Sequence, residues 1–172
     1  MGASEMCLVI HCVCLRDYSK MRAEFEQWLW EVIFKKDRSL LLSDERYLEI
    51  VNETKVALQR KGDRLELSSK QYRRLKRYDL LTIGEKDKLV NKEHLENQSG
   101  LIFYCATSEM YDIIHTAHLQ IGHKREKAME NEIKNKYFNV TREVIYIYLD
   151  LCQSCALKKK AKSKGLVVKP LS

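Results

Sequence analysis

The stretch "HTAHLQIGH", residues 115–123, holds three of the five histidines of the 172-residue chain. His118 and His123 lie five positions apart, and two such positions on one α-helix differ by about 140° around its axis. One continuous helix therefore cannot aim both imidazoles at a single ion. Gly122 stands between them, and glycine is the residue that most often ends a helix. We expect one helix to close at His118 and the next to open at His123.

A second pair of metal-binding side chains follows in "CQSC", residues 152–155, after a spacer of 28 residues that has room for two helices. Cys152 and Cys155 lie three apart, so both sulfurs can converge from the end of a helix and the turn after it. Two imidazoles and two thiolates are a closed tetrahedral set for Zn²⁺, with no position left for a substrate. We predict a structural zinc site made of His118, His123, Cys152 and Cys155, in a region that folds with metal and loosens without it.

The residues alone leave two alternatives open. The histidines and cysteines could be scattered over the fold without meeting, and a lone Cys-x2-Cys or a lone histidine pair would favour that alternative. His115 and His118, three apart, could also share a helix face and form the histidine pair instead. We prefer His118 with His123, and assign His115 to the core or to contacts behind the ligands.

Apolar periodicity predicts helices in the first part of the chain. Residues 18–36 carry an apolar stripe at helical spacing, and Trp28 and Trp30 beside it are expected to be buried. Ser43 is a predicted N-cap and Gly62 a predicted stop for a second helix. Ser68 or Ser69 then starts a short basic helix. The stripes are formed by Met21, Phe25, Leu29 and Ile33 in the first helix and by Tyr47, Ile50, Val51, Thr54 and Leu58 in the second.

The pattern then changes to alternation. "DLLTIGEKDKLVNK" predicts a hairpin, and "GLIFYCA", residues 100–106, is a third β-like run, so we expect a small antiparallel sheet between residues 79 and 106. Helices are predicted over 108–119, 123–137 and 141–151, with Ser108 capping the first and Asn139 or Thr141 the last. The fold class is α+β, mainly α: N-terminal helices, a small antiparallel sheet, then a zinc-stabilised three-helix bundle.

The predicted organisation has five parts. They are an unassigned segment at 1–16, a helical region at 17–66, a basic helix with the sheet at 67–107, the zinc-binding domain at 108–157 and a basic tail at 158–172.

The formal charge of +7, from 31 Lys and Arg against 24 Asp and Glu, fits a polyanion partner such as nucleic acid. The predicted contact residues flank the zinc ligands: Lys124, Arg125, Lys158, Lys159 and Lys160. The run "KQYRRLKR", residues 70–77, could lie along phosphates or be a solvated helix face. The tail run "KKKAKSK" could be a nuclear localisation signal, a DNA-contacting arm or a disordered tail.

The chain reads as intracellular, because no apolar run approaches the 18 residues or so of a spanning helix. Six cysteines in such a chain favour metal ligands or free thiols over disulfides. Cys105 is a predicted core residue. Cys7, Cys12 and Cys14 could form a second cluster with His11, although their apolar neighbours favour buried or disordered thiols.

Residues 113–160, "IIHTAHLQIGHKREKAMENEIKNKYFNVTREVIYIYLDLCQSCALKKK", resemble the N-terminal HHCC zinc-binding domain of retroviral and gypsy-type retrotransposon integrases. The shared features are the histidine pair ending in Gly122-His123, the helix leading to Tyr137-Phe138, and the helix leading into "CQSC". The flanking "RRLKRYDLLTI" and "KSKGLVVKP" also resemble host proteins that carry a captured integrase, such as those associated with KRAB or SCAN domains. Residues 1–40 carry no such resemblance.

The resemblance implies a helix-turn-helix-like bundle around zinc, with roles in multimerisation and in contacting element-end DNA. In the family, catalysis resides in a following RNase H-like core, which would begin where this sequence ends at Ser172, so no catalytic residue is carried over. Glu126, Glu130 and Glu132 read as solvated helix residues. We therefore expect a non-catalytic zinc module that binds nucleic acid in the nucleus, with no membrane contact and no small-molecule substrate. The alternatives are a multimerisation module, forming a homodimer or binding an integrase-like partner, and the N-terminal fragment of a longer integrase.

Overall fold

A computed structural model describes residues 18–36, 40–96 and 100–157 of the chain. The predicted segments 1–16 and 158–172 lie outside the described residues, and so do Lys158, Lys159 and Lys160. The elements are α2 (Tyr18–Lys36), α3 (Asp44–Gly62), α4 (Ser69–Arg77), β1 (Tyr78–Ile83), β2 (Lys86–Asn91), α5 (Lys92–Glu96), α6 (Thr107–Gln120), α7 (Glu126–Lys134) and α8 (Arg142–Leu151).

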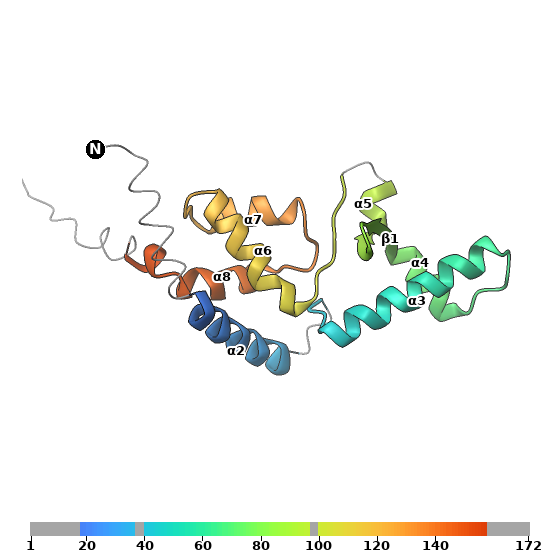
Figure 1. Ribbon diagram of the computed structural model, residues 1–172, viewed down its shortest axis with the longest axis horizontal. Coiled ribbons are helices and arrows are strands. Elements are labelled where there is room, and N and C mark those ends of the chain that lie inside the picture. Colours follow the sequence, from blue (N-terminus) through green and yellow to red (C-terminus); the bar gives the residue numbers. More distant parts are fainter. Residues whose placement is uncertain (1–17, 37–39, 97–99, 158–172) are drawn as a thin grey trace, which may run out of the picture.

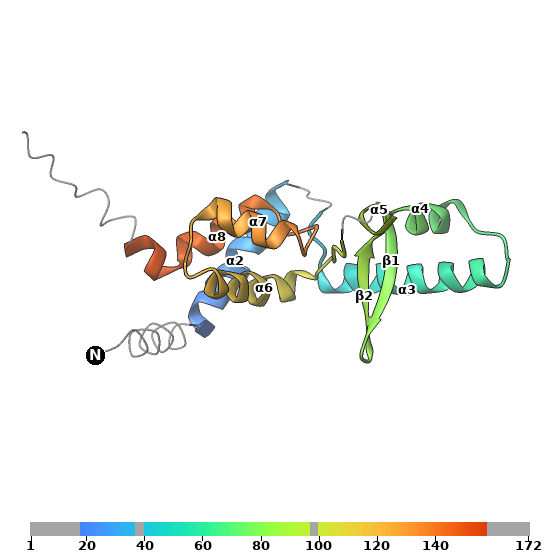
Figure 2. The ribbon, with the colours of Figure 1, turned by 90° about the horizontal axis from the view of Figure 1, so that it is seen from above.

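The structure is elongated, and its described residues form two hydrophobic cores (Figure 1). One core joins α2 to the bundle of α6, α7 and α8. The other lies between α3, the hairpin of β1 and β2, and the segment 101–106, and Figure 2 shows the hairpin crossing α3. The predicted region 17–66 therefore contributes α2 to one core and α3 to the other. The predicted mainly helical α+β class with a small antiparallel sheet is confirmed.

The helix α2 presents a narrower apolar face than its composition suggests. Phe25 and Leu29 are buried against α6 and α8, as predicted. Trp28 and Trp30 are 57% and 62% exposed, so their predicted burial is wrong. Around the helix axis, Trp28 and Trp30 are rotated by about 60–140° from Phe25 and Leu29. Both indole rings therefore lie outside the contact with the bundle.

The sheet has two strands in the described part of the chain, not three. β1 and β2 pair from Tyr78 with Asn91 to Ile83 with Lys86, around a two-residue turn that begins at Gly84 (φ 62°). The predicted third run stays extended but joins the sheet through one bridge, from Phe103 to Val90. Phe103 makes its other bridge to Tyr137 beyond α7, so this segment connects the two cores instead of continuing the sheet.

Two predicted helix caps are present. The Ser43 hydroxyl accepts a hydrogen bond from the Arg46 amide at 3.3 Å. Ser68 forms a capping box with Gln71, each side chain accepting from the other residue's backbone N–H. No membrane-spanning helix is found in the described ranges, because none there is both long enough and apolar enough.

Of the caps predicted for the bundle, Ser108 is wrong, and of the two candidates for α8 Thr141 holds the N-cap position while Asn139 does not. α6 begins at Thr107, and both the amide and the hydroxyl of Ser108 donate to Asp44 of α3. Asn139 is fully buried and bonds to Cys105, while Thr141 holds the N-cap position of α8 without a side-chain hydrogen bond. These partners are far away in sequence, so a local pattern could not show them.

Candidate metal centre

The first histidine pair is positioned by the way α6 ends. The His123 amide donates to the His118 carbonyl at 3.1 Å, and the Gly122 amide donates to the Leu119 carbonyl at 3.0 Å. This is a Schellman motif, which requires a left-handed residue just past the helix. Gly122 supplies it with φ 66°. The chain therefore reverses direction immediately after His118, as the position of the glycine predicted.

His123 lies in this turn and does not open the next helix, which corrects the prediction. Its φ is 55°, in the left-handed region that few residues other than glycine adopt, although histidine tolerates it better than most. α7 begins three residues later, at Glu126. The left-handed backbone returns the His123 imidazole toward His118, with ring centroids 4.4 Å apart and planes at 84°. Such outliers persist where the surroundings fix them, often at functional sites.

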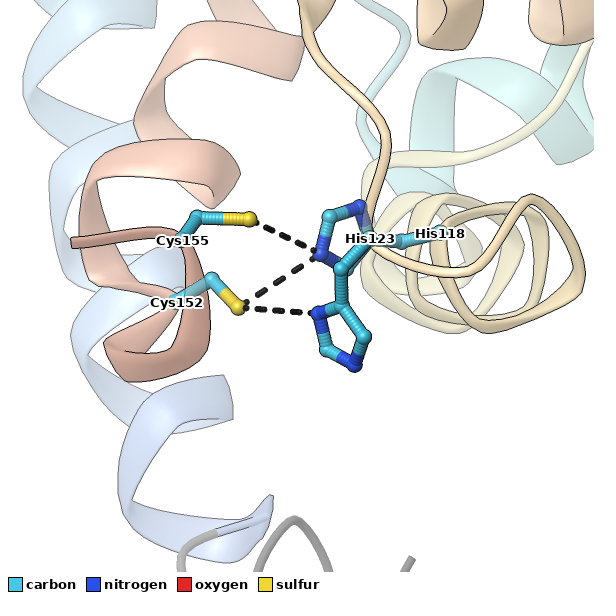
Figure 3. Close-up of side chains that lie close together, drawn as sticks. All are labelled: His118, His123, Cys152 and Cys155. Carbon is cyan, nitrogen blue, oxygen red and sulfur yellow. Dashed lines mark hydrogen bonds between the residues drawn. The ribbon is translucent and has the colours of Figure 1, made fainter. Parts of the chain in front are cut away.

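The two cysteines come from the end of α8. Cys152 is the C-cap residue, and its amide donates to the Tyr148 carbonyl at 3.1 Å. Residues 153–157 form a further helical turn in which the Ala156 amide donates to the Cys152 carbonyl. Cys155 sits in this turn, so both sulfurs face the end of α6 (Figure 3).

The four predicted ligand side chains meet. One ligand atom from each of His118, His123, Cys152 and Cys155 lies within 4.8 Å of all the others. Nε2 of His118 is 3.4 Å from the Cys152 sulfur and 3.3 Å from the Cys155 sulfur. Nδ1 of His123 is 3.5 Å from the Cys152 sulfur. The alternative of scattered side chains is therefore wrong.

These separations fit a shared ion better than hydrogen bonds. A ring nitrogen carries one hydrogen or one lone pair, yet Nε2 of His118 faces two sulfurs at nearly equal distance. In a tetrahedral zinc site with Zn–S of about 2.3 Å and Zn–N of about 2.0 Å, nitrogen and sulfur ligands lie about 3.5 Å apart. The three N···S distances of 3.3, 3.4 and 3.5 Å agree with that edge length. The donor set therefore fits a tetrahedral metal ion such as zinc.

The site also favours the thiolate form that a metal requires. The hydrogen bond from Cys155 and, after it, that from His118 lower the pKa of the Cys152 thiol to about 3, although burial acts in the opposite direction. His118 is fully buried and Cys152 nearly so. Nδ1 of His118 and Nε2 of His123 are buried without a hydrogen-bond partner among the described residues, so packing orients these rings.

His115 lies behind the ligands and is not one of the four. Its Nδ1 is 2.8 Å from the Tyr148 hydroxyl, and its ring stacks on Tyr111 at 5.6 Å. Burial and, after it, the charge of His118 lower the pKa of His115. Tyr148 was not predicted from the sequence. Its ring is buried and packs edge-on against the His118 imidazole, with ring centroids 5.3 Å apart. Its place four residues before Cys152, on the same helix face, is the signal that could have found it.

The other predicted site residues lie outside this cluster. Lys124 and Arg125 are exposed in the turn between His123 and α7, and Arg125 is the N-cap residue of that helix. The three glutamates of α7 make ion pairs with nearby cations rather than pointing to the cluster. The pairs are Glu126 and Glu130 with Arg142, Glu130 with Lys134, and Glu132 with Lys136.

Fold and site together define a small helical module with an HHCC-like metal-binding group. No family model and no solved structure matches the chain. Among curated proteins, the chain is similar to KRAB-A domain-containing protein 2 from Homo sapiens. The two are 35% identical over 157 residues, which cover 91% of this chain and 31% of that protein. The chain thus spans about a third of the length of this curated relative, and the similarity agrees with the predicted likeness to KRAB-associated host proteins.

Proposed function

We propose that the chain is a non-catalytic zinc-binding module, derived from a retroelement integrase, that binds nucleic acid through basic surfaces in the nucleus. The observation that carries the proposal is the convergence of two imidazoles and two sulfurs within 4.8 Å. The order of these ligands along the chain is that of the HHCC domain of integrases. The similarity to a KRAB-A domain-containing protein and the net charge of +7 support a nuclear, polyanion-binding role.

Zinc would have a structural role in this module. His118, His123, Cys152 and Cys155 would hold it, and when bound it supplies cross-links between the end of α6 and the end of α8. Four protein ligands fill a tetrahedral ion, which leaves no open position for a reacting water or substrate. This closed set supports the proposal that the module is not an enzyme and takes no small-molecule substrate.

Elemental analysis of the purified protein tests the metal. We expect one zinc per chain in the wild type, and none in the double variant Cys152→Ser with Cys155→Ser. Cys105→Ala is the matched control, because Cys105 is a buried free thiol away from the cluster. A wild-type protein that is cooperatively folded without zinc would overturn the proposal, and so would loss of zinc in the control alone.

The nucleic-acid role rests on cations beside the metal centre. Lys124 and Arg125 are exposed directly after His123, and Lys158, Lys159 and Lys160 would extend the same basic character after the helical turn that holds Cys155. Fluorescence anisotropy at several salt concentrations measures this role. Each cation that contacts duplex phosphates adds about 0.9 to the slope of log affinity against log salt. Lys124→Ser with Arg125→Ser should therefore lower the slope by about 2, and an unchanged slope would remove these two residues from the interface.

A multimerisation module is the second candidate, and the exposure of Trp28 favours it. This ring is 57% exposed on α2, whose other face packs on the bundle. Large aromatic side chains are enriched at protein interfaces, including those of homodimers. Light scattering across a concentration series tests this candidate: a dimer that dissociates in Trp28→Ala would support it, and a monomer at all concentrations would exclude a homodimer. Co-purification with an integrase-like protein would test the other partner.

The third candidate is the N-terminal part of a longer integrase. The share of 31% that the chain covers of its human relative is the observation behind it. Mass spectrometry of the natural protein's C-terminus separates the two possibilities. A terminus at Ser172 supports the isolated module, and a longer product with a catalytic core would establish the third candidate.

A further inference from the structure

The short helix α4 carries a basic face. Five of its nine residues are Lys or Arg; Lys70, Arg73 and Arg77 lie on the side opposite the buried Leu75, and Arg74 and Lys76 lie beside it. Arg73 and Arg77 are one turn apart and both are exposed, with Lys76 beside them. A repeat of positive charge on one side of a helix can follow a phosphate backbone.

This face forms one wall of a groove of about 950 Å³. The floor includes buried Tyr78, buried Tyr104 and the Asn91 amide, which donates to the Tyr104 hydroxyl at 3.1 Å. Phe138, 43% exposed, lies on the far side, where its ring meets Tyr104 at 5.3 Å. The groove is therefore a basic channel with an accessible aromatic ring, built where the two cores meet. Its charged lining residues are Lys70, Arg73, Arg74, Lys76, Arg77 and Glu93.

Many surface cations that the structure describes are neutralised by a neighbouring carboxylate. Lys55, Lys88 and Arg142, for example, each pair with a carboxylate. Within the groove, Lys70 and Arg74 share Glu53. Arg73, Lys76 and Arg77 make no ion pair within residues 18–36, 40–96 and 100–157, and Glu93 is the one carboxylate in the described lining. A concave surface with three unneutralised cations complements a polyanion.

The concave shape of the groove and the exposed ring of Phe138 favour a single-stranded nucleic acid over a duplex. A duplex is a convex cylinder with its bases stacked inside, so it can reach cations at the rim but cannot place a base against Phe138. A single strand fits a groove and exposes its bases for stacking on aromatic side chains. We infer that this groove binds a single-stranded nucleic-acid segment, with Arg73, Lys76 and Arg77 on its phosphates and Phe138 against a base. The inference rests on the proposed nucleic-acid function and adds a site distant from the metal centre.

Anisotropy titrations of the full, zinc-loaded chain test the groove, using 12-nucleotide single-stranded DNA and RNA probes and a 12-base-pair duplex. Each phosphate contact on a single strand adds about 0.7 to the salt slope, so three contacts add about 2. Raising salt from 50 to 200 mM then weakens binding about 18-fold through these contacts alone. The variant Arg73→Ser, Lys76→Ser, Arg77→Ser should lose this dependence. The charge-matched control is Lys20→Ser, Lys61→Ser, Lys86→Ser, which removes three exposed cations scattered over other elements.

The aromatic contact has its own variants. Phe138→Leu keeps apolar volume against Tyr104 but lacks the aromatic face, and it should weaken single-strand binding about tenfold at an unchanged melting temperature. Trp30→Leu, which makes the matching change at an exposed aromatic residue on α2, should bind like the wild type. If the two triple variants show the same affinity and salt dependence, the groove does not bind a single strand. The same conclusion follows if the duplex binds more tightly than either single strand. In both cases the proposed function is unaffected. A wild type that binds none of the probes overturns both.

Discussion

Replacing Gly122 by alanine should destabilise the protein through the backbone alone. Gly122 has φ 66°, where an L-residue with a Cβ is disfavoured by about 1–2 kcal/mol. A Cβ built at this position meets nothing within 4 Å, so no steric clash adds to that figure. The expected decrease in the free energy of unfolding is therefore about 1–2 kcal/mol.

The same substitution at Gly62 should have the opposite sign. Gly62 is the last residue of α3, has no positive φ, and has the same open space around its Cβ position. Alanine there restricts the unfolded chain and suits the helix, which stabilises by about 0.4–1 kcal/mol. The two variants should thus differ by about 1.5–3 kcal/mol, although each adds one methyl group to an exposed turn or helix end.

Urea denaturation of the zinc-loaded variants measures this difference, with calorimetry as a second readout. For a chain of this size, 1 kcal/mol corresponds to about 2–4 °C in melting temperature. Gly122→Asn should fall between wild type and Gly122→Ala, because asparagine tolerates the left-handed region. Equal stabilities of Gly122→Ala and Gly62→Ala would refute the backbone argument, and with it the account of how His123 is brought back to His118.

Three further predictions concern the surroundings of the metal centre. The folded-state pKa of Cys152, about 3, lies below the ~8.5 of a free thiol, so its thiolate contributes stability that is fully present above about pH 8.5 and is lost as the pH falls toward 3. Urea titrations of the zinc-loaded wild type at falling pH should show this loss of stability, and Cys152→Ser should show a smaller one. Tyr148→Phe removes the 2.8 Å contact to His115 Nδ1 and should cost about 0.5–1.5 kcal/mol, measured by urea denaturation, with zinc content unchanged. Asn139→Ala leaves the buried amide and carbonyl of Cys105 without their partner and should cost about 2–5 kcal/mol in the same assay, and a cost under 1 kcal/mol would contradict that assignment.

The four clustered side chains could be predicted because local geometry constrains them. Five-residue spacing excludes one helix, Gly122 marks the reversal, and a spacer of two helices returns the chain. The backbone of His123 was not predicted, although the signal was present. Placing Gly122 just past the helix makes His123 the second residue of a Schellman motif, so it belongs to the turn and cannot open α7.

The misplaced features share one cause, which is that distant segments decide them. Trp28 and Trp30 read as core residues by composition, but the bundle covers only the Phe25–Leu29 side of α2. Ser108 reads as a cap, but its partner is Asp44, 64 positions earlier. Asn139 reads as a cap as well, but its amide satisfies Cys105, 34 positions earlier. Periodicity shows that a helix exists, and tertiary packing determines which of its faces is used.

The metal centre and the groove are joined by a short chain of contacts. Phe138 at the groove directly precedes Asn139, whose side chain is bonded to both backbone groups of Cys105. Cys105 belongs to the same core as Cys152, while its neighbour Tyr104 forms the groove floor. A metal ion held by the four clustered side chains would therefore also fix the segment that carries Phe138. Four protein ligands would fill a tetrahedral zinc ion, so under the proposed function we expect zinc to affect nucleic-acid binding by ordering the bundle and not by contact between the ion and the bound strand.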